Sequence, residues 1–548
     1  MNIEKLRSII SGEVDTSAEA IQKYSKDASL FTVQPEMVVF PKDVKDLEHI
    51  VSFVYEEKKN SPSLSITGRS AGSDMTGGPL NESIILDFTK YFKHIDINTE
   101  KLQATIEPGV FYRDFEKVAS PLGVEYPIYP ASKQLAAFGG IVMNNSAGEK
   151  TLRYGQARDF VEEVSIVLSD GKEHTFKPIT LHELNEKMQG SNYESETYRK
   201  VYTLINDNYD VIKAAEPNVH KNSAGYALWR VLDKEKGIFD MTQLFVGSQG
   251  TLGLLTKAKV RVMKHKPHKK MVVIFFKSWD NLPQVVNEIL PFQPESLETF
   301  DDQTLTLGMR FMPEIAKKVG QNFFRFALRF IPETLIGIRM LRLPKLIMLV
   351  EIAEEDEELA SKKTREIYNV VQKHNGTYPR ILKDSRDQEK YWIMRRESFN
   401  LLRQHVKGKR TAPFVEDFCI NPEKMPEFLP KLLHILKKSG IKANIAGHAG
   451  DGNYHIIPLM DLTKESERKK IVPVADEVFT LIKEFGGTIT AEHNDGIIRT
   501  PYLEQMFGTK IYSLFIEIKK IFDPENIFNP GKKVGGSKEY IEAHITRE

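Results

Sequence analysis

The sequence predicts an α+β protein built from two main domains. Its 548 residues are enough for about two to four domains, each with a sizeable core. The first half carries three glycine-rich stretches beside predicted strands, and after Pro267 apolar strands are each followed by a helical pattern. We therefore expect a helical lead-in at 1–34, a first domain at 35–266, a second domain at 267–500 and a C-terminal helical segment at 501–548.

The composition excludes several classes of protein. Lysine plus arginine (76) nearly equal aspartate plus glutamate (75), so the net charge gives no reason to expect a nucleic-acid partner. The single cysteine, Cys419, excludes an internal disulfide, an iron–sulfur cluster held by this chain's cysteines and a multi-cysteine zinc site. The N-terminus has no signal-peptide core and no apolar run approaches about 18 residues, which predicts a cytoplasmic protein without a membrane span.

The first domain is predicted to open with a helix followed by a glycine-rich loop. Pro41 starts the helix, whose apolar residues recur at spacings of three and four up to Tyr55. The loop at 67–78, TGRSAGSDMTGG, follows an apolar–polar alternation and precedes an apolar run at 84–88. This indicates a strand–loop–strand unit, unlike the strand–loop–helix of a Rossmann or P-loop site. Its glycines let several backbone N–H groups turn toward one anion, and its hydroxyls add donors, as a pyrophosphate requires.

A second glycine-rich stretch lies at 138–148, FGGIVMNNSAG, after a predicted strand at 102–106 and a helix near Phe111. Glycines beside small residues allow a flat ligand to approach the backbone closely, while the Asn-Asn-Ser run supplies polar contacts.

The third stretch, GSQGTLGLLT at 247–256, leads into a predicted strand at 258–263. Between it and the second stretch we expect a strand at 161–168 and a tight hairpin turn at 169–172. Three such stretches beside strands in one domain indicate a ligand site more strongly than any one of them.

Four motifs in this order resemble the FAD-binding domain of the vanillyl-alcohol-oxidase/p-cresol-methylhydroxylase superfamily: the loop at 67–78, FGGIVMNNSAG at 138–148, KNSAGY at 221–226 and GSQGTLG at 247–253. The resemblance covers roughly 35–263 and implies a two-subdomain FAD-binding domain. It implies that the first loop holds the FAD pyrophosphate and that the other segments line the adenine and isoalloxazine. The residues expected to bind the cofactor are Thr67, Gly68, Arg69, Ser70, Ala71, Gly72, Ser73, Thr76, Gly77, Gly139, Gly140, Asn144, Asn145, Ser146, Gly148, Tyr154, Gly250, Thr251, Gly253 and Asn529.

Some members of that superfamily tether FAD covalently through a histidine in the first loop. Here residues 69–73 read Arg-Ser-Ala-Gly-Ser and include neither histidine nor cysteine. We therefore expect noncovalent FAD.

The second domain is predicted from apolar strands at 271–276 and 346–352, each followed by a helix. The five acids at 354–358 fit the start of a helix on a solvated face. Between the strands lies an insert, 309–345, that is apolar and basic together, with eight basic residues against two acids, a local excess of 8 − 2 = +6.

The insert allows more than one interpretation. Pro313 starts a predicted helix that carries on one face Ile315, Val319, Phe323, Phe326 and Phe330. Such a segment is long enough to lie on an anionic bilayer as a peripheral contact on the inner face of the membrane, but too interrupted to cross it. An ordinary packed helical hairpin or a dimer contact are the alternatives.

A second chemistry-bearing group comes from GHAGDGNYH at 447–455 and AEHNDG at 491–496. His448 and His455 flank a Gly-Asp-Gly turn, so two adjoining strands could bring them to one point, as a zinc-type site needs. A predicted strand at 487–490 would place the next two residues, Glu492 and His493, on opposite faces. A set of structural, hydrogen-bonded histidines remains the alternative.

These motifs, with the C-terminal run at 521–532 (IFDPENIFNPGK), resemble the D-2-hydroxyacid dehydrogenase branch of the superfamily, which includes D-lactate, glycolate and D-2-hydroxyglutarate dehydrogenases. The resemblance implies an α+β substrate (cap) domain with an antiparallel sheet, and a C-terminal helix that returns to the FAD domain. It places His448, His455 and Glu492 on the metal ligands (zinc, or manganese or iron), His493 on the catalytic base, and Asn453 with Arg395 or Arg396 near the substrate.

One departure bears on the substrate and the acceptor. Most of the branch has Glu-His-Gly where this chain has Glu-His-Asn-Asp-Gly at 492–496, a version that resembles the flavin part of longer flavin/iron–sulfur fusion dehydrogenases. The resemblance implies oxidation of a D-2-hydroxy acid, with electrons passed to a quinone, an electron-transfer flavoprotein or an iron–sulfur subunit. A metal-independent FAD oxidase of an alcohol or lactone that uses oxygen, and a catalytically silent flavin subunit of an electron-transfer complex, are the rival interpretations.

Overall fold

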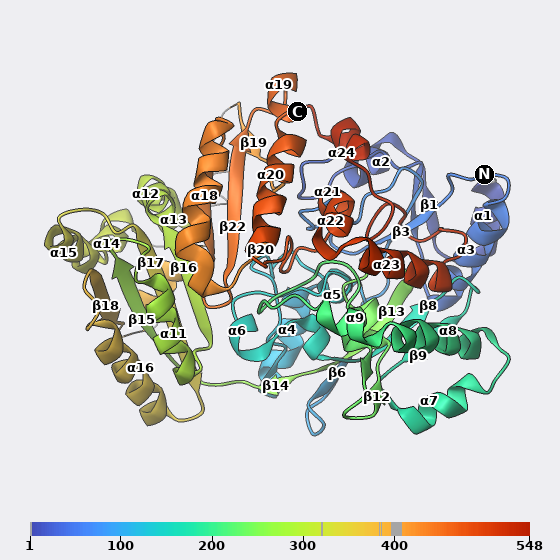
Figure 1. Ribbon diagram of the computed structural model, residues 1–548, viewed down its shortest axis with the longest axis horizontal. Coiled ribbons are helices and arrows are strands. Elements are labelled where there is room, and N and C mark those ends of the chain that lie inside the picture. Colours follow the sequence, from blue (N-terminus) through green and yellow to red (C-terminus); the bar gives the residue numbers. More distant parts are fainter. Residues whose placement is uncertain (1–2, 319–321, 383, 385, 396–407) are drawn as a thin grey trace.

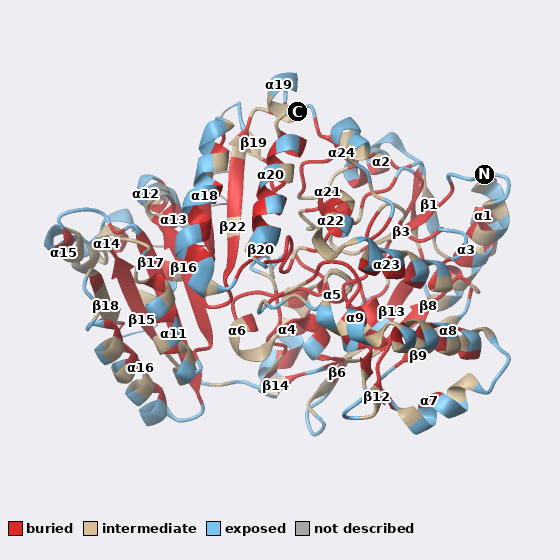
Figure 2. Ribbon diagram, in the orientation of Figure 1, coloured by how far each residue is buried: buried red, intermediate tan, exposed pale blue. Residues whose placement is uncertain are grey.

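The computed structural model describes all residues except 1–2, 319–321, 383, 385 and 396–407. It has two lobes, with the first domain and the C-terminal helices on one side and a large antiparallel sheet with its helices on the other (Figure 1). Buried residues concentrate in the strands of both lobes, while the outer helices such as α7 Leu181–Met188 and α16 Glu357–Val371 are largely exposed or half-buried (Figure 2).

The first lobe begins with a four-stranded sheet in the order β1-β2-β4-β3, in which β4 runs parallel to β2 and β3. Helices α1 and α3 pack on one face of this sheet, and α2 packs on the other. These elements are α1 Ile3–Ile9, β1 Glu13–Asp15, α2 Ala18–Tyr24, β2 Met37–Phe40, α3 Val44–Glu57, β3 Ile66–Arg69 and β4 Ile84–Asp87. The predicted strand–loop–strand at 67–78 is therefore confirmed, with β3 before the loop and β4 after it.

Two sequence predictions for this sheet need correction. The lead-in is not purely helical, because β1 pairs antiparallel with β2. The helix predicted from Pro41 begins at Val44 instead, since the Asp43 carboxylate accepts the backbone N–H of Asp46 (3.1 Å) and so caps the first turn.

The rest of the first domain is built on a five-stranded antiparallel sheet, ordered β5-β6-β13-β8-β9, beside two small sheets, β10-β12-β11 and β14-β7. The strands predicted at 102–106 and 161–168 are confirmed as β6 and β8. The elements here are β5 Ile95–Asn98, β6 Gln103–Ile106, α4 Tyr112–Ala119, β7 Val124–Glu125, α5 Phe138–Met143, α6 Thr151–Tyr154, β8 Val161–Val167, β9 Glu173–Phe176, β10 Ile179–Thr180, α8 Tyr193–Asp207, α9 Tyr209–Ala214, β11 Leu232–Asp233, β12 Ile238–Phe239, α10 Thr242–Phe245, β13 Leu254–Arg261 and β14 Met263–Lys264.

The second lobe is built on an antiparallel sheet in the order β18-β15-β17-β16-β21-β22-β19, with β20 against β22. Side chains alternate across it: Val272 and Ile274 pack among helices α11, α16, α18 and α20, whereas Val273 faces the opposite side with Tyr391. The elements are β15 His268–Phe276, α11 Leu282–Ile289, β16 Ser296–Asp301, β17 Leu346–Glu354, β18 Thr377–Ile381, β19 Arg410–Thr411, β20 Phe418–Cys419, α18 Met425–Lys438, β21 Lys442–His448, β22 Asn453–Met460, α19 Glu465–Arg468 and α20 Ile471–Glu484.

The insert between β16 and β17 forms several short helices. They are α12 Asp302–Arg310, α13 Met312–Lys318, α14 Phe323–Leu328 and α15 Ile331–Met340. The single helix predicted from Pro313 to Phe330 is wrong, because Asn322 starts a new helix by accepting the N–H of Phe324 (3.0 Å). On the predicted apolar face, Ile315, Phe326 and Phe330 pack inward together, and Val319 lies outside the described residues.

The chain ends with α21 Gly496–Arg499, α22 Leu503–Phe507, α23 Thr509–Phe522 and α24 Lys538–His544. The predicted return to the first domain is confirmed, because Phe515, Ile518 and Phe522 of α23 are part of that domain's core. Among the described residues, no helix is both long and apolar enough to cross a membrane.

Lys519 of α23 is a buried cation that joins distant segments. Its Nζ lies 2.5 Å from Asp523 Oδ2 and donates to the carbonyl oxygens of Thr251 (2.7 Å) and Phe528 (2.6 Å). Because removal of one partner leaves the other charge buried and unpaired, we expect Lys519→Met to destabilise the protein by about 3–5 kcal/mol.

Thermal unfolding of matched variants tests this. Lys520→Met removes the neighbouring, exposed lysine, which lies 3.1 Å from Glu517, and should cost no more than about 1 kcal/mol. A similar fall in melting temperature for both variants would contradict the assignment.

Candidate active site

One cavity of about 570 Å³ brings the glycine-rich stretches of the first domain together with the histidine group of the second. Its walls include His455, Glu492 and His493. Eleven of the predicted cofactor-binding residues line it: Gly68, Ser70, Ala71, Gly72, Ser73, Gly139, Gly140, Asn144, Ser146, Gly250 and Gly253.

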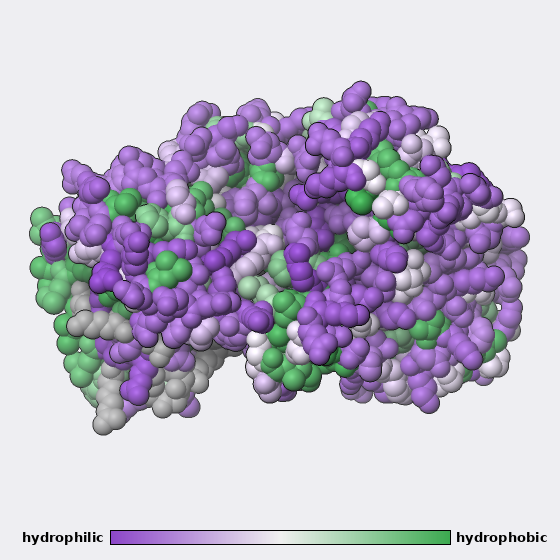
Figure 3. Space-filling view, turned by 90° about the horizontal axis from the view of Figure 1, so that it is seen from below, coloured by the Kyte–Doolittle hydropathy of each residue, from purple (hydrophilic) through white to green (hydrophobic). Residues whose placement is uncertain are grey.

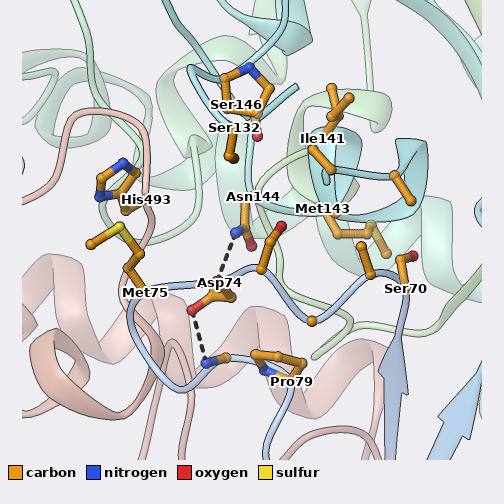
Figure 4. Close-up of a pocket in the computed structure, with 18 of the residues that line it drawn as sticks. Ser70, Asp74, Met75, Pro79, Ser132, Ile141, Met143, Asn144, Ser146 and His493 are labelled. Carbon is orange, nitrogen blue, oxygen red and sulfur yellow. Dashed lines mark hydrogen bonds between the residues drawn. The ribbon is translucent and has the colours of Figure 1, made fainter. Parts of the chain in front are cut away.

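Asp74 organises the first loop at the wall of this cavity. Its carboxylate accepts the backbone N–H groups of Thr76 (2.5 Å) and Gly78 (3.3 Å) and the side-chain amide of Asn144 (2.7 Å). Figure 4 shows Asp74 between Asn144 and the backbone next to Pro79, with His493 on the far side of Met75. The first loop is thus tied to the second glycine-rich stretch by a residue that the sequence analysis did not single out.

The other nine predicted cofactor residues do not line the cavity. The Arg69 guanidinium donates to the carbonyl oxygens of Tyr24 (3.2 Å) and Lys26 (2.7 Å), and the Thr67 hydroxyl donates to Asn529 Oδ1 (2.9 Å). Arg69 and Thr67 thus tie the first loop to neighbouring segments of the chain. The nine residues that do not line the cavity are Thr67, Arg69, Thr76, Gly77, Asn145, Gly148, Tyr154, Thr251 and Asn529.

Glycines keep the cavity open in two ways. A Cβ at Gly139 would lie 2.2 Å from Ser70 Oγ, so only glycine permits this contact between the loops. A Cβ at Gly140 would meet no protein atom within 4 Å, and one at Gly250 only Gly253 O at 3.8 Å. Both lie on the cavity wall, so a side chain at either position would take up space that a bound ligand could otherwise use.

At the other end of the cavity, three imidazoles surround one carboxylate oxygen. Glu492 Oε1 lies 3.4 Å from Nε2 of His448, 3.2 Å from Nε2 of His455 and 3.6 Å from Nε2 of His493. The prediction that adjoining strands bring the first two histidines together is confirmed, because His448 ends β21 and His455 lies near the start of its antiparallel partner β22.

The strand predicted at 487–490 is wrong, and Glu492 and His493 do not point to opposite faces. In this stretch only Thr488 makes a bridge, to Cys419. The buried Asp417 carboxylate accepts the backbone N–H groups of Ala491 (3.1 Å), Glu492 (3.1 Å) and His493 (2.7 Å). Three successive N–H groups that converge on one carboxylate curl the chain, so both side chains reach the same site.

Glu416, next to Asp417, orients two of the histidines from behind. Its Oε2 lies 2.7 Å from Nδ1 of His493 and 3.6 Å from Nδ1 of His455, while its Oε1 accepts from Arg499 Nη2 (2.7 Å). Burial alone would lower the pKa of His493, but the Glu416 and Asp417 carboxylates raise it to about 10. In return, although burial opposes it, His493 and Arg499 hold the pKa of Glu416 well below its usual range.

His448 is held by a second carboxylate and leaves one nitrogen unsatisfied. Its Nδ1 lies 2.5 Å from Glu298 Oε1, and its buried Nε2 has no hydrogen-bond partner among the described residues. Burial would lower the pKa of His448, but Glu298 is the main cause of its rise to about 9.

Lys221 supplies a positive charge beside the carboxylates of Glu492 and Asp451. This buried ammonium lies 3.3 Å from Glu492 Oε2 and 3.2 Å from Asp451 Oδ2. Although burial opposes both shifts, the two carboxylates raise the pKa of Lys221, and the lysine and His448 keep the pKa of Glu492 well below its usual range.

Of the two predicted substrate residues, only Arg395 lies on the cavity wall. Arg395 is buried, lines the cavity and pairs with Glu298, while Glu149 lies 3.9 Å away. Asn453 does not line the cavity, since its amide group donates to the carbonyl of Phe418 (3.0 Å) and to Asp417 Oδ1 (3.3 Å). Arg396, the alternative, lies outside the described residues.

Sequence reasoning missed the charged residues that position the histidine group. One signal was available: the acids of APFVEDFCI at 412–420 interrupt an otherwise apolar run, and such an acid pair is buried at a cost. Glu298 had no local signal, because its partner His448 is 150 residues away. The missed residues of the histidine group are Lys221, Glu298, Glu416, Asp417, Asp451 and Arg499. Asp74, which organises the first loop, was missed as well.

Comparison with known proteins agrees with this geometry. Residues 35–177 match the FAD binding domain, and residues 265–533 match the C-terminal domain of FAD linked oxidases. The chain therefore carries both domains of FAD linked oxidases. The recognised superfamily and the predicted fold are confirmed, and the solved p-cresol methylhydroxylase has the same fold (TM-score 0.67, 15% identity, 97% of this chain and 96% of that one).

Two of the curated relatives are a dehydrogenase and an oxidase subunit. The chain is 25% identical to D-2-hydroxyglutarate dehydrogenase of Escherichia coli (strain K12) over 95% of its own length and 50% of the relative's. It is 26% identical to glycolate oxidase subunit GlcD of Bacillus subtilis (strain 168), over 93% of this chain and 91% of the relative. The chain thus spans about half the length of the first of these relatives.

The cavity fits the FAD that such a binding domain takes. Gly140 and Gly250 leave open the places beside the backbone that a Cβ would fill, and Ser70, Ser73 and Ser146 line the same space. Backbone N–H groups and hydroxyls are the donors that a pyrophosphate needs.

Gly140→Val tests the flavin cradle. Since a Cβ at Gly140 meets no protein atom within 4 Å outside its own helix α5, we expect the variant to fold but to lose most of its FAD. Gly337→Val, at a helical glycine of α15 that is equally free of contacts and does not line the cavity, serves as the control. The measurement is the ratio of flavin to protein absorbance after purification; an unchanged ratio for Gly140→Val would place FAD elsewhere.

Proposed function

We propose that this protein with both domains of FAD linked oxidases is a metal-assisted dehydrogenase that oxidises a D-2-hydroxy acid, of the D-lactate or D-2-hydroxyglutarate type, to the 2-oxo acid. The observation that carries the proposal is the convergence of three imidazole Nε2 atoms on Glu492 Oε1 at the end of the flavin cavity. The names of the relatives, D-2-hydroxyglutarate dehydrogenase and glycolate oxidase subunit, support this substrate class.

His448, His455 and Glu492 would hold the metal ion. Two imidazoles and one carboxylate suit zinc, manganese or iron. The buried Nε2 of His448, which has no hydrogen-bond partner among the described residues and lies 3.4 Å from Glu492 Oε1, could serve as one ligand atom. Asp417 also lies close enough to be considered with His455, Glu492 and His493. We favour His448 over Asp417 because the Asp417 oxygens already accept three backbone N–H groups. A bound ion would polarise the substrate hydroxyl and carboxylate.

His493 is the proposed base. It lines the cavity, with the Glu416 carboxylate at its Nδ1. The surrounding carboxylates raise its pKa to about 10, and the positive charge of a metal ion at Glu492 would oppose that rise, so that a neutral imidazole could take the proton of the substrate hydroxyl at Nε2. Arg395 would exchange its pairing with Glu298 for the substrate carboxylate, which a guanidinium can bind with two parallel hydrogen bonds. FAD, when bound, accepts the hydride from C2.

We also propose that FAD is held without a covalent bond, since residues 69–73 contain no histidine or cysteine. Electrons would then leave to a quinone, an electron-transfer flavoprotein or an iron–sulfur subunit. Cys419, the only cysteine, cannot by itself ligate a cluster, and burial raises the pKa of its thiol to about 12.

Replacement of a proposed ligand tests the metal. His448→Ala and His455→Ala should each lose bound metal and dye-linked turnover together, because two remaining ligands hold an ion poorly. His434→Ala, an exposed histidine of α18, should keep both. Elemental analysis and turnover are measured on the same samples; full activity in metal-free protein would end the metal assignment.

His493→Ala tests the base and the reaction class. We expect FAD and metal to remain bound while turnover of the best D-2-hydroxy acid falls by roughly 10²–10⁴-fold, the usual contribution of a positioned general base.

The assay compares an artificial dye with oxygen as electron acceptor. Wild-type turnover with oxygen as fast as with the dye would instead favour the oxidase alternative.

A further inference from the structure

Helices α14 and α15 of the insert expose an unusual number of large apolar side chains. Of the fifteen exposed large hydrophobic residues in the described chain, nine lie between Met309 and Leu343. Figure 3 shows hydrophobic residues gathered at the end of the molecule where Figure 1 places α14 and α15. We name this set the apolar end; its members are Met309, Phe323, Phe324, Leu328, Ile331, Leu335, Ile338, Leu341 and Leu343.

The outer face of α15 is apolar by its helical spacing. Ile331, Leu335 and Ile338 recur at i, i+4 and i+7 and are 51%, 61% and 64% exposed. Position 341 continues past the helix end, where Leu341 is 90% exposed. A leucine exposed to this extent in a packed domain contributes nothing to its own core.

The inner face of α15 fixes this orientation. Met340 is buried and Ile336 packs against the sheet, while Glu333 bonds with Arg380, Lys390 (2.9 Å) and Tyr391. Rotation of the helix to hide its outer face would break these contacts and leave the buried Lys390 ammonium without the Glu333 carboxylate. The apolar side chains are therefore held outward by the fold itself.

Positive charge accompanies the apolar end. The insert carries an excess of +6 in a chain whose net charge is +1, so the remaining residues carry 1 − 6 = −5. Arg339 and Arg342 are exposed next to the outer face of α15, and Arg310 and Lys317 are exposed on α12 and α13. One of its two acids, Glu333, faces inward to the partners named above.

These features favour an anionic lipid surface over a protein partner. Helices α14 and α15 form an outer end of the molecule (Figure 1) and can enter a deformable layer, while arginine side chains reach lipid phosphates with their apolar stems along the hydrocarbon. A second copy would bring the same +6 segment face to face with this one, which like charges disfavour.

We propose that the apolar end docks the protein on the surface of a membrane that contains anionic lipid, with Leu335, Ile338 and Leu341 in the interface and Arg339 and Arg342 at the phosphates. This goes beyond the proposed reaction and does not depend on it. The proposed contact lies at the membrane surface and does not cross the bilayer, because none of the described helices is long and apolar enough to span it.

The test is co-sedimentation of the flavin-loaded full chain with vesicles. We expect the wild type to sediment with vesicles of phosphatidylcholine plus phosphatidylglycerol at low salt, and far less with phosphatidylcholine alone or at high salt. Leu335→Glu/Ile338→Glu should abolish sedimentation, and Arg339→Gln/Arg342→Gln should weaken it by on the order of tenfold or more at low salt.

Matched controls carry the same changes elsewhere. Val118→Glu/Leu122→Glu alters two exposed apolar residues of the first domain, and Lys362→Gln/Arg365→Gln alters two exposed cations of α16; both should sediment as wild type. The flavin spectrum of each variant verifies folding. The proposal fails if the wild type stays in the supernatant at low salt, if Leu335→Glu/Ile338→Glu sediments as well as the controls, or if ultracentrifugation shows that this face instead joins two copies.

Discussion

The adjacent buried acids Glu416 and Asp417 make the contact on which the rest of the site depends. Two carboxylates at successive positions, both almost fully buried, are costly unless donors and cations surround them. The donors come from residues 490–499, which supply three backbone N–H groups to Asp417 and the Arg499 guanidinium to Glu416. The acid pair lies just before β20, so it joins the large sheet to the segment that leads back to the first domain.

The same acid pair sets the geometry and electrostatics of the histidine group. Asp417 (φ 73°) and Asn494 (φ 72°) both adopt the left-handed region, which costs roughly 1–2 kcal/mol per non-glycine residue, and the surrounding hydrogen bonds offset that cost. The curled loop turns Glu492 and His493 toward one point, and Glu416 fixes which nitrogen of His493 faces the cavity. Lys221 pairs with Glu492, and Glu298 pairs with His448. These pairs of opposite charge offset the repulsion among the buried carboxylates and among the histidines.

The sequence predicted those parts of the site that depend on local pattern. Glycines beside strands marked the loops, of which Gly68, Gly140 and Gly250 do line the cavity, and the Gly-Asp-Gly turn predicted the pairing of His448 with His455. It failed where a distant partner decides the structure. The strand predicted at 487–490 does not form, because the Asp417 carboxylate, some 70 residues away, binds the segment. No sequence pattern near Glu298 indicates that it contacts His448. In the insert, the periodicity indicated apolar residues on one side of a helix, and Ile315 and Phe326 of that set do pack together in the interior. The exposed apolar face lies on α15 instead, and the packing of α15 against the rest of the domain decides this.

Anaerobic flavin bleaching measures most directly whether this cluster and this cavity form one reactive site. Metal-loaded, FAD-bound protein is mixed without oxygen with the D and L forms of lactate and 2-hydroxyglutarate, and the flavin absorbance is followed. We predict that one D acid bleaches the flavin, that its L form does not, and that removal of the metal abolishes the effect. Bleaching at an unchanged rate in metal-free protein, or no bleaching by any of these acids, would contradict the proposed union of the Glu492 histidine group with the flavin site.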